Sequence, residues 1–182
     1  MLNERDYKKV VNYALSDTDI QTLLSPNTTN IISYPDLVNV NDINDIFDGL
    51  GRCVVFIPLS ESFGHWCCLI KRSNSIEWFD PYSIKPDEEK KWINEQVLKR
   101  LHEDQPYLTN LLKDAYHKGV KILYNPYKWQ ADKANVSDCG RFVAWRCMNY
   151  NKTLKQLNTI ISKSKLTPDE YVTNVTYNKL GK

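Results

Sequence analysis

Residues 66–80 decide the fold of this chain and read Trp66-Cys-Cys-Leu-Ile-Lys71-Arg-Ser-Asn-Ser75-Ile-Glu-Trp-Phe-Asp80. Two compact apolar runs, residues 66–71 and 75–80, are typical of buried strands. The polar residues between them suit a turn, so the two runs predict an antiparallel hairpin. Positions symmetric about such a turn lie about 4.5–5.5 Å apart. The midpoint between His65 and Asp80 falls within this turn, so we expect the two residues to face each other, within one residue of register.

The flanking sequence predicts several helices and further strands. A serine three residues before an acidic residue, Ser16 and Asp19, indicates a helix start near the N-terminus. We expect helices over 1–24, 42–47, 87–102, 138–150 and 166–171, strands over 53–58 and 119–124, and loops over 26–34 and 126–136. This order predicts one α+β domain, residues 1–182, with a mostly antiparallel central sheet flanked by helices.

The composition excludes several classes of protein. The chain has 182 residues, of which 42% are hydrophobic and 25% are charged, and this excludes disorder, collagen and coiled coil. A net charge of +2 requires neither a nucleic-acid nor a membrane partner. We expect no secretory signal and no membrane span, because no basic stretch leads into an apolar core and no apolar run approaches about 20 residues. The sequence predicts a protein of a reducing compartment with free thiols.

Five cysteines cannot all pair in disulfides within one chain. Cys53, Cys67 and Cys68 lie in predicted strands and Cys147 lies inside a predicted helix, so we interpret them as buried packing residues. Cys67 and Cys68 are consecutive in a strand and should point to opposite faces of the sheet. The cysteines form no CxxC pair, so neither a metal nor another cofactor is predicted. Cys139 is different because it begins a helix.

Cys139 lies in the segment Ser137-Asp138-Cys139-Gly140. A helix N-terminus and a nearby imidazolium both stabilise a thiolate, which is the nucleophilic form of cysteine. His65 beside Asp80 has the arrangement of a general base and the carboxylate that orients it. We interpret Asp138 as the helix N-cap. Each of these residues alone is typical of packing or of a turn, but together they predict a catalytic nucleophile, base and orienting acid.

Other residues are expected to surround this group. Gln130 is the candidate for a side-chain amide that would hold an oxyanion together with the backbone N–H near Cys139. Gly140 leaves room for a substrate beside the thiol. Trp66 and Trp129 flank the expected site residues and are candidates for lining a substrate cleft.

A clan of cysteine peptidases carries similar motifs in the same chain order. This clan holds the SUMO-type deconjugating proteases and adenain, the adenovirus maturation protease, and the resemblance covers roughly residues 53–150. It implies a permuted papain-like α+β fold, a triad of His65, Asp80 and Cys139, and an oxyanion role for Gln130. The family glutamine usually lies six or seven residues before the cysteine, whereas Gln130 lies nine before it; Asn135 is a nearer amide. The matching residues are Gly64-His65-Trp66, Trp78-Phe79-Asp80, Gln130 and Ser137-Asp138-Cys139-Gly140.

Within the clan, residues 64–70 and 139–146 look most like the viral branch, which includes adenain and the maturation proteases of virophages and polinton-like elements. The resemblance implies a monomeric cysteine endopeptidase, in the host cytoplasm or the virion, that processes capsid or other virion precursor proteins next to glycine. Two alternatives stay open: a protease that removes a ubiquitin-like (SUMO-type) modifier, and a catalytically inactive binding module of the same fold. No cofactor, metal or membrane partner is implied, and the need for a peptide or DNA activator is left open.

Overall fold

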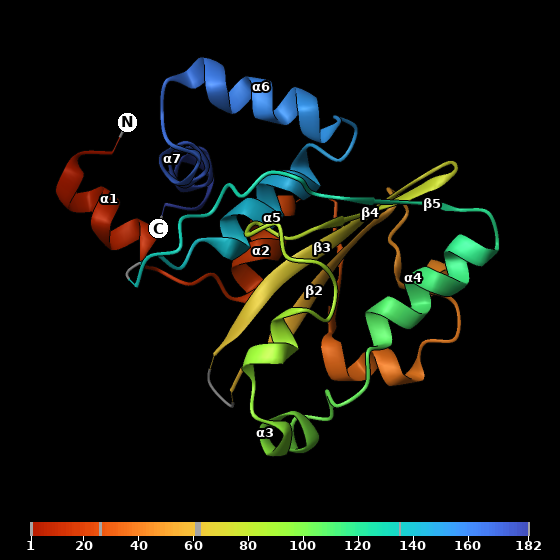
Figure 1. Cartoon of the computed structure of the whole chain (residues 1–182). Helices are drawn as coiled ribbons and strands as arrows, with labels where there is room; N and C mark the ends of the chain where they lie inside the picture. The colour runs from red at the N-terminus through yellow and green to blue at the C-terminus, as the bar shows by residue number, and fades with distance from the viewer. Residues whose placement is uncertain (1, 26, 61–62, 135, 182) are drawn as a thin grey trace.

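A five-stranded mixed sheet runs through the centre of the computed structural model, which describes residues 2–25, 27–60, 63–134 and 136–181 (Figure 1). The strands lie in the order β1-β2-β3-β4-β5, and helices cover both faces. The helices are α1 Glu4–Val11, α2 Asp17–Leu24, α3 Glu95–Arg100, α4 Tyr107–His117, α5 Cys139–Met148, α6 Leu154–Ser164 and α7 Pro168–Leu180, with 3-10 helices η1 Tyr34–Asn39, η2 Ile43–Ile46 and η3 Glu89–Trp92. The strands are β1 Asn30–Ser33, β2 Arg52–Pro58, β3 Gly64–Arg72, β4 Ser75–Phe79 and β5 Lys121–Tyr124.

The predicted α+β class with a mostly antiparallel central sheet is confirmed, although the parallel pairing at the two edges was not expected. The central strands β2, β3 and β4 are antiparallel, whereas both edge strands run parallel to their neighbours. The edge strand β1 falls in the segment expected to be a loop. It pairs on one side only and its side chains are exposed or half-buried, so its sequence shows no compact apolar run.

The predicted β3–β4 hairpin is present, with a two-residue turn at 73–74. Arg72 pairs with Ser75 and Cys68 pairs with Phe79. Continuing this register places Asp80 across from Cys67, two residues from the predicted position opposite His65. The expected register is therefore wrong, because the two-residue loop, the commonest hairpin connection, puts the centre of the hairpin one residue later in the chain.

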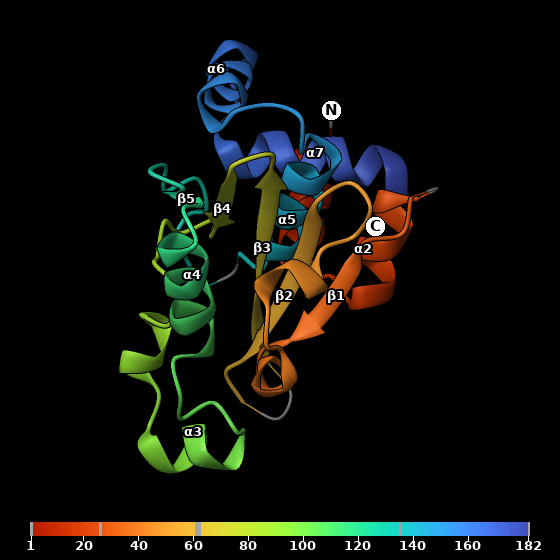
Figure 2. The ribbon, with the colours of Figure 1, turned by 90° about the vertical axis from the view of Figure 1, so that its right-hand side faces the viewer.

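The two faces of the sheet carry different helices. Helices α2, α5, α6 and α7 pack over one face, where Cys68 lies in the core, and α4, η1 and η2 pack over the other, where Cys67 lies (Figure 2). The prediction that these two consecutive cysteines point to opposite faces is confirmed. Helix α5 therefore reaches the sheet from the side opposite α4, with its N-terminus toward one end of β3.

The N-terminal helix prediction holds in part, because residues 4–24 form two helices instead of one. Ser16 begins α2 as predicted, and its hydroxyl and the Asp19 side chain form a reciprocal capping box. Such a cap stabilises a helix by about 1 kcal/mol. The bend between α1 and α2 brings Leu15 to Trp66, whose Nε1 donates to the Leu15 carbonyl at 2.9 Å.

The helix expected over 87–102 is also divided, into η3 and α3. Asp87 has a left-handed backbone with φ of 66°, and Ile93 is extended, so neither continues a helix. Asp87 instead accepts hydrogen bonds from the Tyr34 hydroxyl and from the backbone N–H of Thr109.

Helix α4 was not predicted at all, and the expected last short helix is the longer α7. In the part of the chain that the structure describes, no helix combines the length and apolar character needed to cross a membrane.

Candidate active site

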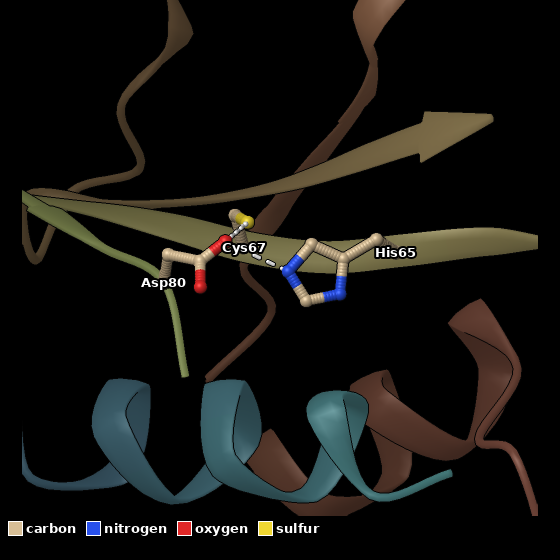
Figure 3. Close-up of side chains that lie close together, drawn as sticks. All are labelled: His65, Cys67 and Asp80. Carbon is tan, nitrogen blue, oxygen red and sulfur yellow. Dashed lines mark hydrogen bonds and ion pairs between the residues drawn. The ribbon is translucent and has the colours of Figure 1, made fainter. Parts of the chain in front are cut away.

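Strand β3 extends beyond the end of β4, and this overhang carries His65. Strand β4 ends at Phe79, opposite Cys68, so residues 64–67 have no partner on that side and the turn after Asp80 folds into the space. His65 Nε2 lies 2.8 Å from Asp80 Oδ2 (Figure 3). The two residues are diagonal neighbours across the hairpin, a separation that long side chains span. The predicted contact is thus present even though the predicted register is not.

The Asp80 carboxylate is held by four hydrogen-bond donors. Its Oδ1 accepts from the backbone N–H groups of Tyr82 at 2.6 Å and Ile84 at 3.4 Å. Its Oδ2 accepts from His65 and also from the Cys67 thiol at 3.1 Å. The residue is 1% exposed. Because hydrogen bonds to the charged form stabilise it, these donors offset the cost of burying a carboxylate.

Cys139 is the first residue of α5 and differs from the other four cysteines, which are all buried, by being partly exposed. Its thiol interacts with the His65 side chain. Since Nε2 faces Asp80, Nδ1 is the ring nitrogen left for Cys139. Burial by itself would lower the pKa of His65, but its interactions with Cys67 and its hydrogen bonds to Asp80 and Cys139 raise that pKa well above its ordinary value.

His65 and Cys139 both line a cavity of about 980 Å³. Most of the remaining lining is apolar, supplied by residues of the α1–α2 bend, β1, β2, α3 and the loop before α5. Tyr82 closes one side: its ring lies 5.4 Å from the His65 ring at an angle of 32°. Burial raises the pKa of Tyr82 to about 12, so its hydroxyl stays neutral at physiological pH. The cavity is a half-open, largely apolar space with the imidazole and the thiol at its wall.

Gln130 lies in the same cavity, and the loop before it is bound to the residue after Asp80. The backbone N–H groups of Trp129 and Gln130 both donate to the Pro81 carbonyl, at 3.0 and 3.1 Å. The Gln130 side chain is 2% exposed, and its Oε1 is buried with no hydrogen-bond partner among the described residues. Attachment to Pro81 brings Gln130 to the cavity despite its long spacing from Cys139. Asn135, the nearer amide, lies outside the described residues.

The three cleft candidates have different positions. Trp66 lines the cavity that holds Cys139. Trp129 lies in the core, 4% exposed, between Phe79 and Trp145, and the structure does not bring it to the wall of this cavity. The expected space at Gly140 is also absent, because a Cβ there would lie 3.0 Å from Leu15 Cβ and 3.1 Å from Trp66 Cδ1. Glycine at this position lets α5 pack closely on its neighbours.

Asp138 occupies the expected N-cap position of α5, but its side chain makes no capping hydrogen bond. It is fully buried, and its carboxyl group is hydrogen-bonded to the side chain of Asp169. Burial raises the pKa of Asp138 to about 9, and the negative charge of the neighbouring Asp169 contributes to the rise. Asp169 accepts a backbone hydrogen bond from Ala131 at 3.0 Å, so it carries the charge while Asp138 keeps the proton. Asp138 is therefore neutral beside Cys139.

Sequence reasoning missed two residues of the site. Cys67, interpreted as a packing residue, contacts Asp80, and Tyr82 covers His65. The two-residue alternation of a strand could have found Cys67, because positions 65 and 67 share a face. No comparable signal marks Tyr82, whose position depends on the turn after Asp80.

His65, Cys67 and Asp80 are the described residues that could together hold a metal ion, with ligand atoms within 4.8 Å of one another. Both His65 Nε2 and Cys67 Sγ are already hydrogen-bonded to the same oxygen, Asp80 Oδ2 (Figure 3). A metal there would replace the hydrogen bond that orients the imidazole. The arrangement therefore favours proton transfer at His65 over metal binding.

Comparison with known proteins places the chain in a family. No family model matches the sequence. A relative described as the uncharacterized protein V9 of Sputnik virophage is 35% identical over 175 residues, which cover 93% of this chain and 96% of the relative. The chain belongs to the same family as this virophage protein.

Solved structures with an overall likeness share much less sequence with the chain. The C-terminal Ulp1 protease domain, solved in complex with Smt3, the yeast ortholog of SUMO, is 16% identical with a TM-score of 0.40, over 98% of this chain and 83% of that one. The central domain of the uncharacterized Lpg1148 protein from Legionella pneumophila is 16% identical with a TM-score of 0.42, over 92% of this chain and 97% of that one.

Proposed function

We propose that this protein is a cysteine endopeptidase in which Cys139 is the nucleophile, His65 the general base and Asp80 the residue that orients His65. The observation that carries the proposal is the chain of contacts at the cavity wall. Asp80 Oδ2 lies 2.8 Å from His65 Nε2, and the imidazole interacts in turn with the partly exposed Cys139 thiol. A nucleophile, a base and an orienting group in series are the arrangement that acyl transfer requires.

The chemistry follows from these positions. His65 takes the proton of the Cys139 thiol, and the thiolate attacks the substrate carbonyl carbon. The Gln130 amide and the backbone N–H of Cys139 donate to the developing oxyanion; the first N–H groups of α5 have no acceptor within the helix. The imidazolium then gives its proton to the leaving amine, and water hydrolyses the resulting thioester with His65 again acting as base. Asp80 keeps the ring oriented throughout and stabilises its positive charge.

The proposed substrates are capsid or other virion precursor proteins, cleaved next to glycine. Membership of a family that includes a virophage protein supports a role in a virus life cycle. A ubiquitin-like modifier is the alternative substrate, and the catalytic steps would be the same for both. A ubiquitin-like modifier must also bind to a surface outside the cavity, whereas a precursor segment need not. Offering both substrates to the protein therefore decides which of them it cleaves.

The test offers the purified full-length protein both substrate classes. We expect it to cleave virion precursors encoded beside it, at bonds next to glycine identified by mass spectrometry of the products. We also expect a glycine-ended peptide vinyl sulfone to label Cys139. Labelling should disappear in Cys139→Ala and weaken in His65→Ala, with Cys147→Ala, a buried thiol on the same helix, as the matched control.

Three outcomes contradict the proposal in different ways. Cleavage that persists in Cys139→Ala would remove Cys139 from the mechanism. Cleavage of ubiquitin-like fusions with no cleavage of precursors would replace the proposed substrate by the alternative one. A protein that is folded, cleaves neither class and is not labelled at Cys139 is a binding module, not a peptidase.

A further inference from the structure

The Cys67 side chain lies at the centre of the candidate site, although the proposed mechanism gives it no role. It is fully buried, and its sulfur lies 3.1 Å from Asp80 Oδ2, the same oxygen that contacts His65 Nε2 (Figure 3). Two features of the sheet produce this contact. Cys67 is two residues from His65 on β3 and so shares its face, and the hairpin register continues to place Asp80 across from Cys67.

The short separation fixes which group carries the proton. Two negative charges cannot both be buried 3.1 Å apart without a large electrostatic cost, so the sulfur and the carboxylate share one proton. Ordinary thiols are more basic than ordinary carboxyl groups, with pKa values of about 8.5 against about 3.9. The proton therefore belongs to the sulfur, and Cys67 is the donor of this hydrogen bond.

This donor completes the hydrogen bonding of Asp80. The turn after Asp80 supplies two backbone N–H groups, from Tyr82 and Ile84, and both go to Oδ1. Without Cys67, the only hydrogen bond on Oδ2 among the described residues would come from His65 itself. A second donor on Oδ2 fixes the plane of the carboxylate and with it the direction in which it orients the imidazole.

On the basis of the proposed function, we infer that Cys67 is a positioning residue: its thiol holds the Asp80 carboxylate in line with His65 Nε2. The competing interpretation is that Cys67 only fills space, since it also belongs to the core cluster beneath α4. Cys53 is the matched control, because it is a fully buried cysteine of the same cluster, on β2, and its sulfur faces the Val54 carbonyl instead of the site.

The two interpretations predict opposite rankings of kcat for two substitutions of Cys67, to serine and to valine. Cys67→Ser keeps a hydrogen-bond donor, whereas Cys67→Val keeps a buried apolar side chain, somewhat larger than cysteine, and loses the donor. We expect Cys67→Ser to retain kcat within about threefold of wild type, and Cys67→Val to lower kcat at least about tenfold with KM unchanged. Cys67→Ala should lose as much activity as Cys67→Val, so a valine that does not fit cannot hide the result. In Cys53, valine should be tolerated at least as well as serine.

A second measurement needs no substrate. The N–H proton between His65 and Asp80 should give a strongly downfield NMR signal, absent in His65→Ala. We expect this signal in Cys67→Ser and in both Cys53 variants, and its shift or loss in Cys67→Val. An unchanged signal in folded Cys67→Val, or equal kcat for the serine and valine variants, overturns the inference. If the wild-type protein cleaves nothing, the proposed function fails on its own while the NMR comparison still decides the role of Cys67.

Discussion

The protein contains two buried aspartates close to Cys139, and their surroundings are opposite. Asp80 is 1% exposed and accepts four hydrogen bonds, whereas Asp138 is 0% exposed and the side-chain partner of its carboxyl group is a second carboxyl group, that of Asp169. Burial disfavours a charged carboxylate in both places. The difference lies in the donors, so the turn and strand around Asp80 stabilise an anion, while Asp138 beside Asp169 retains a proton.

This contrast assigns the two aspartates different tasks. An anionic Asp80 can stabilise a positive imidazole, and the raised pKa of His65 agrees with that role. A neutral Asp138 puts no charge next to the Cys139 thiolate. Closeness to Cys139 in sequence is therefore a poor guide to the contacts of the site: Asp138 adjoins Cys139 in the chain, but Asp80 is the aspartate that contacts His65.

We expect the largest effect on activity from Asp80→Asn, and a far smaller one from the same substitution at Asp138. Asp80→Asn leaves the shape of the side chain but removes the charge that orients and stabilises the imidazolium. We expect kcat/KM to fall by about a thousand- to ten-thousandfold. The alkaline limb of the pH–rate profile should move to lower pH, because losing the carboxylate lowers the pKa of His65. Steady-state kinetics on a glycine-ended peptide across pH 5–10 measure both effects.

Asp138→Asn is the control for that substitution and should change the rate less than about threefold. A loss at Asp138 as large as the loss at Asp80 would show that the contrast between the two aspartates has no functional meaning.

Gln130 differs from Asp80 in its hydrogen bonding, because its Oε1 is buried without a partner among the described residues. We expect Gln130→Ala to lower kcat by about a hundred- to a thousandfold with a smaller change in KM, since an oxyanion donor acts mainly in the transition state. Gln130→Glu keeps the shape, removes the donor and should lose as much. An unaltered kcat in both variants would assign the oxyanion to another donor.

The smallest expected effect is on stability and concerns Asp138. Its pKa is about 9 in the folded protein and about 3.9 in an unfolded chain, so between these values the folded state holds the extra proton. The wild-type free energy of unfolding should therefore fall as pH rises through this window, by up to about 1.4 kcal/mol per pH unit from this group. Asp138→Asn removes that dependence and should be the more stable protein at pH 8, by at least about 1 kcal/mol.

Urea unfolding of both proteins at pH 5 and pH 8 measures this effect. A stability difference between wild type and Asp138→Asn that is the same at the two pH values would mean that Asp138 does not retain its proton on folding.

Much of the central fold was predictable because its signals are local. The apolar runs predicted β2, β3 and β4, and the capping pattern at Ser16 predicted the start of α2. Elements whose sequence is not compactly apolar were missed. β1 is a half-exposed edge strand, and α4 buries its apolar face only because the sheet and η1 lie beside it. Such faces are stabilised by tertiary contacts more than by local propensity.

The site was predictable as a set of residues but not as a geometry. Residue types and chain order pointed to His65, Asp80, Gln130 and Cys139, and the structure brings all of them to one cavity wall or its support. The different positions of Trp66 and Trp129 were not predictable, because both are tryptophans next to candidate site residues in the sequence. Only the packing of α5 decides that one faces the cavity and the other the core.

The sequence by itself determined the hairpin, the helix that begins at Cys139 and the chemical types available to the site, because these depend on residues close together in the chain. The tertiary structure alone decided the hydrogen bonds of the two aspartates, including the second donor on Asp80 Oδ2. These depend on groups from different elements meeting within about 3 Å, where a shift of one or two residues changes every partner.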